Sequence, residues 1–267
     1  MSIPTEYLNK NKESWNQRTD FHLKSEFYNQ EEFMKGRTSL NSIELDLLGD
    51  IKGKSILHLQ CHFGQDSLSF ARAGAKVTGI DLSDNAIDNA QRLNTELALD
   101  AKFICCNIYD LPQHLEGQFD IVYASYGTIV WLPDLEKWAK IISSYLKPGG
   151  QFVFVEFHPV VMLFDNDFSK IAYRYFNSGP IIETETGTYA DRSATMSKEN
   201  VTWNHSLSEV INSLIKSGLQ IKLLDEHDYS PYNCFSQTEK IADRKYRIKH
   251  LGNKIPMIYS VVARKDK

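Results

Sequence analysis

The stretch LHLQCHFGQDSLSFARAGAKVTGIDLS, residues 57–83, decides the fold. It begins as an apolar strand, turns through a loop with one glycine, Gly64, continues as a helix pattern and ends on a second strand that closes at Asp81. Two apolar strands joined by a helix predict a parallel βαβ unit. The loop and the helix N-terminus then present backbone N–H groups at the carboxyl edge of the sheet, where open α/β sheets bind ligands.

The same alternation of strands and helices continues from Lys54 to Pro159. The apolar runs that predict its strands are SILHLQ, AKVTGID, AKFICC, FDIVYAS and QFVFVEF. Two later runs, LQIKLLDEH and IPMIYSVVARK, have no strong helix between them, which favours an antiparallel pair. The sequence therefore predicts an α/β fold: a Rossmann-like doubly wound sheet, mostly parallel, with an antiparallel closing hairpin and helices on both faces.

The regions outside this alternation surround one core domain. Residues 1–53 indicate an N-terminal helical lid, although the run WNQRTDFHLKSEFY has no clean helical period. Residues 54–159 form the ligand-binding core. Residues 160–205 form an irregular insertion on the substrate side, in which turn residues suggest a hairpin. Residues 206–267 supply a helix and the closing strands of the same core domain.

Length and composition narrow the class of protein. A chain of 267 residues suits one large α/β domain. Its 30 basic and 34 acidic residues give no broad positive field, so we expect no nucleic-acid partner. We also expect a soluble protein without a membrane partner, because the N-terminal residues lack the apolar core of a signal peptide and no run is long enough to span a bilayer. The four cysteines form no Cys-x-x-Cys pair, which predicts reduced thiols in the cytoplasm, and we expect no metal site.

The loop after the first strand limits the kind of ligand. A dinucleotide pyrophosphate needs glycines that let the backbone approach its oxygens, but Gln60 and His62 occupy two of the three glycine-like places. A ligand without phosphates, carrying an amino-acid portion beside a nucleoside, tolerates these side chains. Asp81 fits either ligand, because an acidic residue at the end of the second strand accepts hydrogen bonds from ribose hydroxyls.

Taken in order, these residues resemble the class I S-adenosylmethionine-dependent methyltransferases of the small-molecule type. The resemblance covers Lys54–Pro159 and rests on five ordered signals: ILHLQCHFGQDSLSFARAG, VTGIDLS, CCNIYDLP, FDIVYASYGTIVWLPD and LKPGGQFVFVE. The family's usual first motif has an acidic residue where His58 stands and glycines where Gln60 and His62 stand.

The resemblance implies S-adenosylmethionine as cofactor and assigns it a binding site. Gln60, His62 and Gly64 would surround the methionine part, and Asp81 would hold the ribose hydroxyls. The remaining contacts would be Leu82 against the adenine, Asn107 and the backbone of Ile108 at the adenine edge, Ser125 near the methionine amino group, and Arg37 at the methionine carboxylate if the N-terminal region closes as a lid.

The substrate side of the site is expected to combine aromatic and titratable residues. Tyr126, Thr128 and Trp131 follow the fourth strand, where the family lines its substrate entrance, although aromatic residues there could equally be core. His22, in the N-terminal region, is a further candidate for substrate binding. His158 follows the fifth strand at the same sheet edge and is the candidate general base, needed only if the acceptor arrives protonated.

Glu156 lies two residues before His158 on the same strand face. It could orient His158 or be satisfied by neighbouring backbone.

These observations predict an S-adenosylmethionine-dependent methyltransferase that acts on a small-molecule acceptor. Two alternatives stay open at this point. A nicotinamide-dependent oxidoreductase is disfavoured by Gln60 and His62, and a non-catalytic sensor that binds the methyl donor is not separated from an enzyme by any residue pattern.

Overall fold

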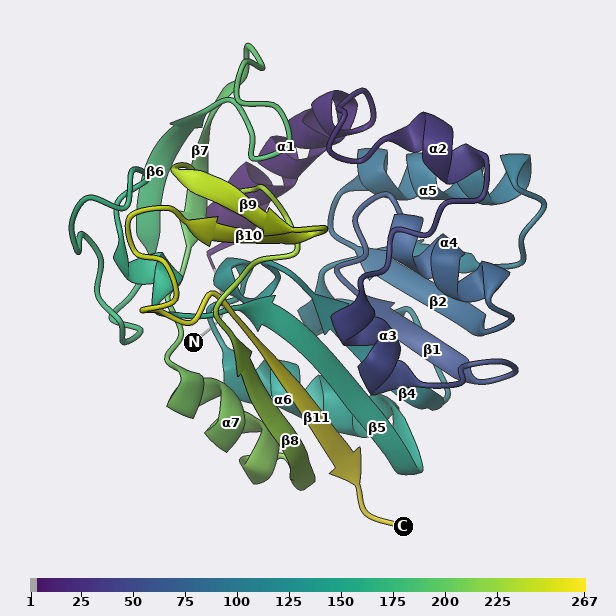
Figure 1. Cartoon of the computed structure of the whole chain (residues 1–267). Helices are drawn as coiled ribbons and strands as arrows, with labels where there is room; N and C mark the ends of the chain where they lie inside the picture. The colour runs from purple at the N-terminus through teal and green to yellow at the C-terminus, as the bar shows by residue number, and fades with distance from the viewer. Residues whose placement is uncertain (1–3) are drawn as a thin grey trace.

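A seven-stranded sheet forms the centre of the molecule, in the order β3-β2-β1-β4-β5-β11-β8 (Figure 1). The structure, a computed structural model, describes residues 4–267. The strands of the sheet are β1 Ser55–Leu59, β2 Lys76–Asp81, β3 Lys102–Cys105, β4 Phe119–Ser125, β5 Leu146–Phe157, β8 Leu219–His227 and β11 Ile258–Lys265. The first five pair in parallel, whereas β11 runs antiparallel to β5 and to β8. The predicted fold class is confirmed.

The closing strands pair antiparallel as predicted, and the structure adds their order, which the sequence did not predict. β11 enters the sheet between β5 and β8 and leaves β8 at the edge. The burial pattern explains this order, because β11 is continuously buried over its first four residues whereas β8 has one buried residue and is otherwise half-buried or exposed. The connection between the two strands also contains a hairpin that the sequence analysis did not predict, formed by β9 Thr238–Ala242 and β10 Lys245–Ile248.

Helices cover both faces of the sheet (Figure 1). One face carries α3 Ser42–Leu48, α4 Gln65–Arg72 and α5 Asp84–Glu96, and the other carries α6 Leu135–Tyr145 and α7 Leu207–Lys216. Neighbouring residues of β5 show the two faces directly. Phe152 packs into the core under α6 and α7, whereas Val153 packs into the core under α3, α4 and α5. Short 3₁₀ helices complete the core connections: η1 Ile108–Gln113, η2 Ile129–Trp131 and η3 Val161–Leu163.

The N-terminal region forms two further helices, α1 Thr5–His22 and α2 Gln30–Met34. The buried side of α1 is polar, with Asn11, Ser14, Arg18, Thr19 and His22. The sequence showed no apolar period there because the residues at helical spacing on the buried face are polar. Their side chains form hydrogen bonds with other elements.

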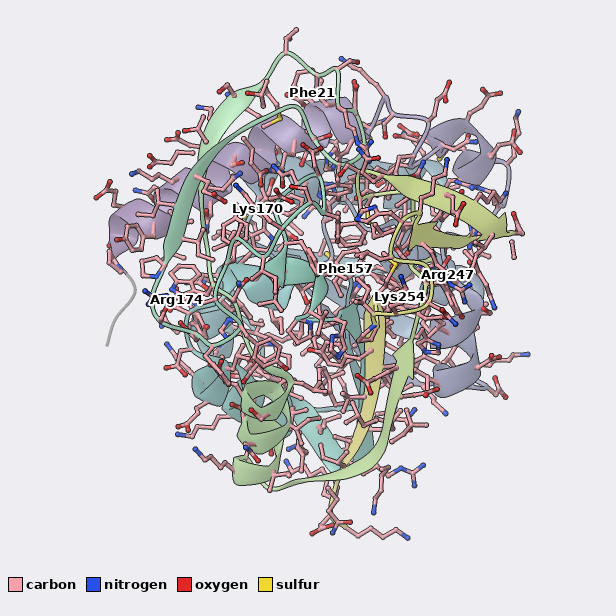
Figure 2. All side chains as sticks on the ribbon, turned by 60° about the vertical axis from the view of Figure 1, so that its left-hand side comes forward. Phe21, Phe157, Lys170, Arg174, Arg247 and Lys254 are labelled. Carbon is pink, nitrogen blue, oxygen red and sulfur yellow. The ribbon has the colours of Figure 1, made fainter. Side chains whose placement is uncertain are left out.

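The insertion forms a second hairpin, β6 Ile181–Thr186 paired with β7 Ser197–Thr202. Asn11 of α1 joins this hairpin through both ends of its amide, which donates to the Val201 carbonyl at 2.8 Å and accepts from the Val201 N–H at 2.9 Å. Figure 1 shows α1, the β6–β7 hairpin and the β9–β10 hairpin at the end of the molecule where the parallel strands finish. Figure 2 shows Phe157, the last residue of β5, in the middle of the molecule with side chains packed around it. The carboxyl edge of the sheet is therefore covered.

In the described part of the chain, no helix combines the length and the apolar character that a membrane crossing requires.

Candidate active site

The loop between β1 and α4 has an alternating left-handed backbone. Gln60, His62 and Gly64 have φ angles of 53°, 52° and 82°. These are the three positions where the usual loop has glycine. The backbone therefore takes the conformation of a glycine-rich loop, although two of the positions hold larger residues. Only Gly64 is fixed by lack of space as well, because a Cβ there would lie 2.8 Å from the Phe103 ring.

Asp81 ties this loop to the end of β2. One carboxylate oxygen accepts the His62 backbone N–H at 2.8 Å, and the other accepts the Ser83 backbone N–H at 2.9 Å. Burial raises the pKa of Asp81 to about 6, although these backbone hydrogen bonds oppose the rise. Each oxygen has a second acceptor site, so the carboxylate can also accept two ligand hydroxyls.

Gln60 links the loop to the segment after β4. Its Nε2 donates to the Thr128 carbonyl at 2.9 Å, and its Oε1 is buried with no hydrogen-bond partner in residues 4–267. The structure thus joins a predicted cofactor residue to a predicted substrate residue. The unpartnered Oε1 leaves one acceptor for a ligand donor.

His22 and His62 are in direct contact. His22 Nδ1 lies 2.9 Å from His62 Nε2, and the outer nitrogen of each ring is buried without a partner in the described residues. Burial lowers the pKa of His62 to about 3 and lowers that of His22 well below its ordinary value, so both rings are neutral at pH 7. Since one inner nitrogen donates and the other accepts, the two outer nitrogens offer one donor and one acceptor to a ligand.

Arg18 is the buried cation beside these histidines, and its charge contributes to the lowered pKa of both rings. Its guanidinium lies over Trp15 and Trp131, with the Cζ 5.5 and 5.7 Å from the ring centroids. Nη2 donates to the Glu185 carboxylate in β6 at 2.5 Å. That carboxylate is half exposed, so the ion pair joins a buried cation to the protein surface.

Arg37, the arginine predicted to bind the methionine carboxylate, follows α2 in the chain. It is exposed, and its Nη2 donates to the Tyr28 carbonyl at 3.1 Å, where it supports the connection between α1 and α2. Arg18 is the arginine that is buried beside His22 and His62. The spacing of Trp15, Arg18 and His22 along one helical face was the signal that could have indicated this.

Aromatic side chains from distant segments close the site. The Tyr28 and Tyr189 hydroxyls are 2.5 Å apart, which joins the N-terminal region to the insertion, and both rings pack against His22. Tyr126 directly follows β4 with a φ of 49°, and its hydroxyl donates to the buried Glu44 at 2.7 Å. Sequence reasoning missed Tyr28 and Tyr189, since nothing local relates two residues that far apart.

The residues predicted to hold the adenine lie at neighbouring strand ends. The register pairs Asp81 with Cys105, so Leu82 and Asn107 follow adjacent strands. Asn107 Oδ1 accepts the Tyr109 N–H at 3.1 Å and caps η1, and Ile108 is buried. Ser125 ends β4 and is half-buried.

His158 does not join the histidine pair. Its Nε2 lies 2.8 Å from the Glu226 carboxylate on β8, and its Nδ1 accepts the Val160 N–H at 3.1 Å. Burial lowers the pKa of His158, and Glu226 opposes that effect. Glu156 does not orient it, because the Glu156 carboxylate bonds backbone N–H groups instead. His158 thus lies against the edge strand β8, whereas His22 and His62 meet at the loop between β1 and α4.

Comparison with known proteins shows which family the core of this chain is similar to. Residues 56–150 match the family model described as a methyltransferase domain. The matched methyltransferase domain contains the loop from Gln60 to Gly64, Asp81 and the segment after β4.

Individual relatives match about half of the chain in sequence and most of it in fold. The ubiquinone biosynthesis O-methyltransferase of Chromobacterium violaceum is 30% identical over 135 residues, which are 49% of this chain and 58% of that protein. The chain thus spans little more than half the length of this curated relative. An S-adenosylmethionine-dependent methyltransferase from Mesorhizobium loti superposes with a TM-score of 0.58 at 19% identity, covering 87% of this chain and 100% of that one. For the geranyl diphosphate C-methyltransferase of Streptomyces coelicolor the TM-score is 0.55 at 16% identity, covering 85% and 76%. The structural matches confirm the fold.

Proposed function

We propose that this protein transfers a methyl group from S-adenosylmethionine to a small-molecule acceptor. The observation that carries the proposal is the junction of Asp81 with the left-handed loop at the carboxyl edge of the sheet. The family match of residues 56–150 supports this function over a nicotinamide-dependent oxidoreductase.

The free polar atoms at the junction fit the donor. Asp81 has acceptor sites for the two ribose hydroxyls, and the buried Gln60 Oε1 has room for one further donor. Arg18 supplies a buried cation for the methionine carboxylate. Leu82 and Asn107 at the adjacent strand ends would bind the adenine, and Ser125 would lie near the amino group.

S-adenosylmethionine supplies an electrophilic methyl group when it is bound. The protein's task is then to align the acceptor and exclude water, and such alignment can contribute about 7–11 kcal/mol in favourable cases. Trp15, Trp131, Tyr28 and Tyr189 exclude water from the covered edge. The neutral His22–His62 pair would bind a hydroxyl of the acceptor through its free ring nitrogens, whereas His158 stays the predicted general base.

The acceptor is proposed to be neutral or anionic. Arg18 lies beside the histidine pair, and its charge would repel an ammonium group close to it. A hydroxyl-bearing molecule meets no such repulsion and can form hydrogen bonds with the imidazoles. The ubiquinone biosynthesis O-methyltransferase that matches this chain is named for methylation at oxygen, which supports this choice.

Calorimetric titration tests the proposed cofactor. We expect S-adenosylhomocysteine to bind the wild-type protein and NADH not to bind. Asp81→Asn should weaken S-adenosylhomocysteine by at least about tenfold, because hydrogen bonds to a charged group contribute about 1.5–3 kcal/mol each. Asp84→Asn is the matched control, since Asp84 lies just beyond β2 on the exposed side of α5 and should leave the affinity unchanged. Binding of NADH in place of S-adenosylhomocysteine would refute the proposed function.

A further inference from the structure

Glu156 makes an unusually complete set of hydrogen bonds at the end of β5. Its side chain is 1% exposed and has no cationic partner among the described residues. The donors to its carboxylate are the backbone N–H groups of Gly127, Thr128 at 2.7 Å, Ile129 at 3.2 Å and Phe157 at 2.7 Å, together with the Thr128 hydroxyl at 3.0 Å. One buried carboxylate therefore fixes the whole turn that follows β4.

This turn needs an acceptor of that kind. It opens with Tyr126 and Gly127 at φ angles of 49° and 80°, a conformation that places successive N–H groups on one side of the chain. A carboxylate has about four acceptor sites and no donor, so it can accept the three N–H groups of the turn, those of Gly127, Thr128 and Ile129. A glutamine would direct its NH₂ group against backbone N–H groups and leave buried donors unpaired.

The turn connects Glu156 to the cofactor loop. Thr128, which is 5% exposed, gives its N–H and hydroxyl to Glu156 and accepts Gln60 Nε2 at its carbonyl, 2.9 Å away. The contact orients the Gln60 amide, because donation by Nε2 leaves Oε1 as the free, buried acceptor. The orientation of Gln60 thus depends on the position of Thr128, which depends on Glu156.

We propose that Glu156 is a positioning residue for methyl-donor binding, which acts through Thr128 on the side chain of Gln60. The inference rests on the proposed function, since it assigns Gln60 Oε1 to the donor. Glu156 itself touches neither the donor nor the acceptor. Its carboxylate is required because it holds the Thr128 carbonyl where Gln60 Nε2 can donate a hydrogen bond to it.

A double-mutant cycle on S-adenosylhomocysteine affinity tests this coupling. We expect Glu156→Gln and Gln60→Ala each to weaken binding about tenfold or more in titration calorimetry. If Glu156 acts through Gln60, the double variant should bind no more weakly than Gln60→Ala alone, within about threefold. A purely structural role for Glu156 would instead give a double variant whose loss is the product of the two single losses.

Asp120→Asn is the matched control. Asp120 is also a carboxylate that accepts a backbone N–H, from Ser55 at 2.8 Å, but it lies at the amino end of β4. We expect Asp120→Asn to lower the melting temperature and to leave the affinity for S-adenosylhomocysteine within twofold of wild type, which separates loss of stability from loss of positioning.

Thr128→Val provides a second route if Glu156→Gln does not fold. It removes one donor to Glu156 at nearly constant volume, and we expect a loss of about threefold that disappears in the Gln60→Ala background. Wild-type affinity in Glu156→Gln, or additive losses in either cycle, would overturn the inference. If the wild-type protein does not bind S-adenosylhomocysteine at all, it is the proposed function that fails.

Discussion

Replacing Arg18 by glutamine should selectively remove recognition of the amino-acid end of the methyl donor. Arg18 is 3% exposed, and its acidic partner, Glu185, is half exposed. The substitution therefore leaves behind a carboxylate that water can solvate, and its cost to folding should be small. Its cost to binding should be larger, because the methionine carboxylate would lose its buried cation.

The expected loss follows from one charge-assisted hydrogen bond in a buried site. Such a bond contributes about 1.5–3 kcal/mol, which corresponds to roughly 10- to 150-fold in affinity. The loss should vanish for 5′-methylthioadenosine, which keeps the nucleoside but lacks the amino-acid part. The ratio of the two affinities therefore reports the contribution of the carboxylate, because damage to the nucleoside site would weaken both ligands equally.

Calorimetry with both ligands on wild type, Arg18→Gln and Arg37→Gln measures this ratio. Arg37→Gln is the matched control, because Arg37 is exposed and its guanidinium donates to the Tyr28 carbonyl. We expect Arg18→Gln to bind S-adenosylhomocysteine about 10- to 150-fold more weakly than wild type and to bind 5′-methylthioadenosine with unchanged affinity. Arg37→Gln should bind both ligands with wild-type affinity. Equal losses for the two ligands would refute the argument, as would a selective loss in Arg37→Gln.

Three further outcomes are expected. Burial lowers the pKa of His58 to about 3, so between about pH 6.5 and pH 3 this histidine takes up a proton only when the protein unfolds. The free energy of unfolding should therefore fall as the pH drops below about 6.5, by up to about 1.4 kcal/mol per pH unit. Urea unfolding between pH 7 and 5 should show a weaker dependence of that free energy on pH in His58→Asn than in wild type. Gly64→Ala should lower stability by about 1–3 kcal/mol, because it adds left-handed strain and a contact with Phe103, and a thermal melt as stable as wild type would contradict this. The backbone amides of residues 15–37 should exchange more slowly once S-adenosylhomocysteine is added, if this region is the lid, and equal exchange in both states would exclude that role.

The core of the fold and the cofactor edge could be predicted because their signals are local. Strands and helices of residues 54–159 bury apolar side chains at regular intervals, and the turns between them follow from short runs of residues. The position of Asp81 at the end of β2, beside the loop with Gly64, follows from that alternation alone. The family resemblance covered the same residues, and the family match extends over 56–150.

The cover of the site required the tertiary structure. The buried face of α1 is polar, so no apolar period marks it, and its partners lie far away: Asn11 pairs with Val201, and Arg18 with Glu185. For the same reason the sequence analysis named Arg37 and did not consider Arg18, since only packing shows which arginine is buried.

The sequence by itself determined the sheet, its helices and the acidic residue at the end of β2. Each of these strands and helices buries apolar residues at a regular spacing, and that spacing can be read within the element alone. Only the tertiary structure decided which groups Glu156, His158 and Arg18 contact. A buried polar side chain is defined by the donors and acceptors that surround it, and those come from segments whose meeting depends on the whole fold.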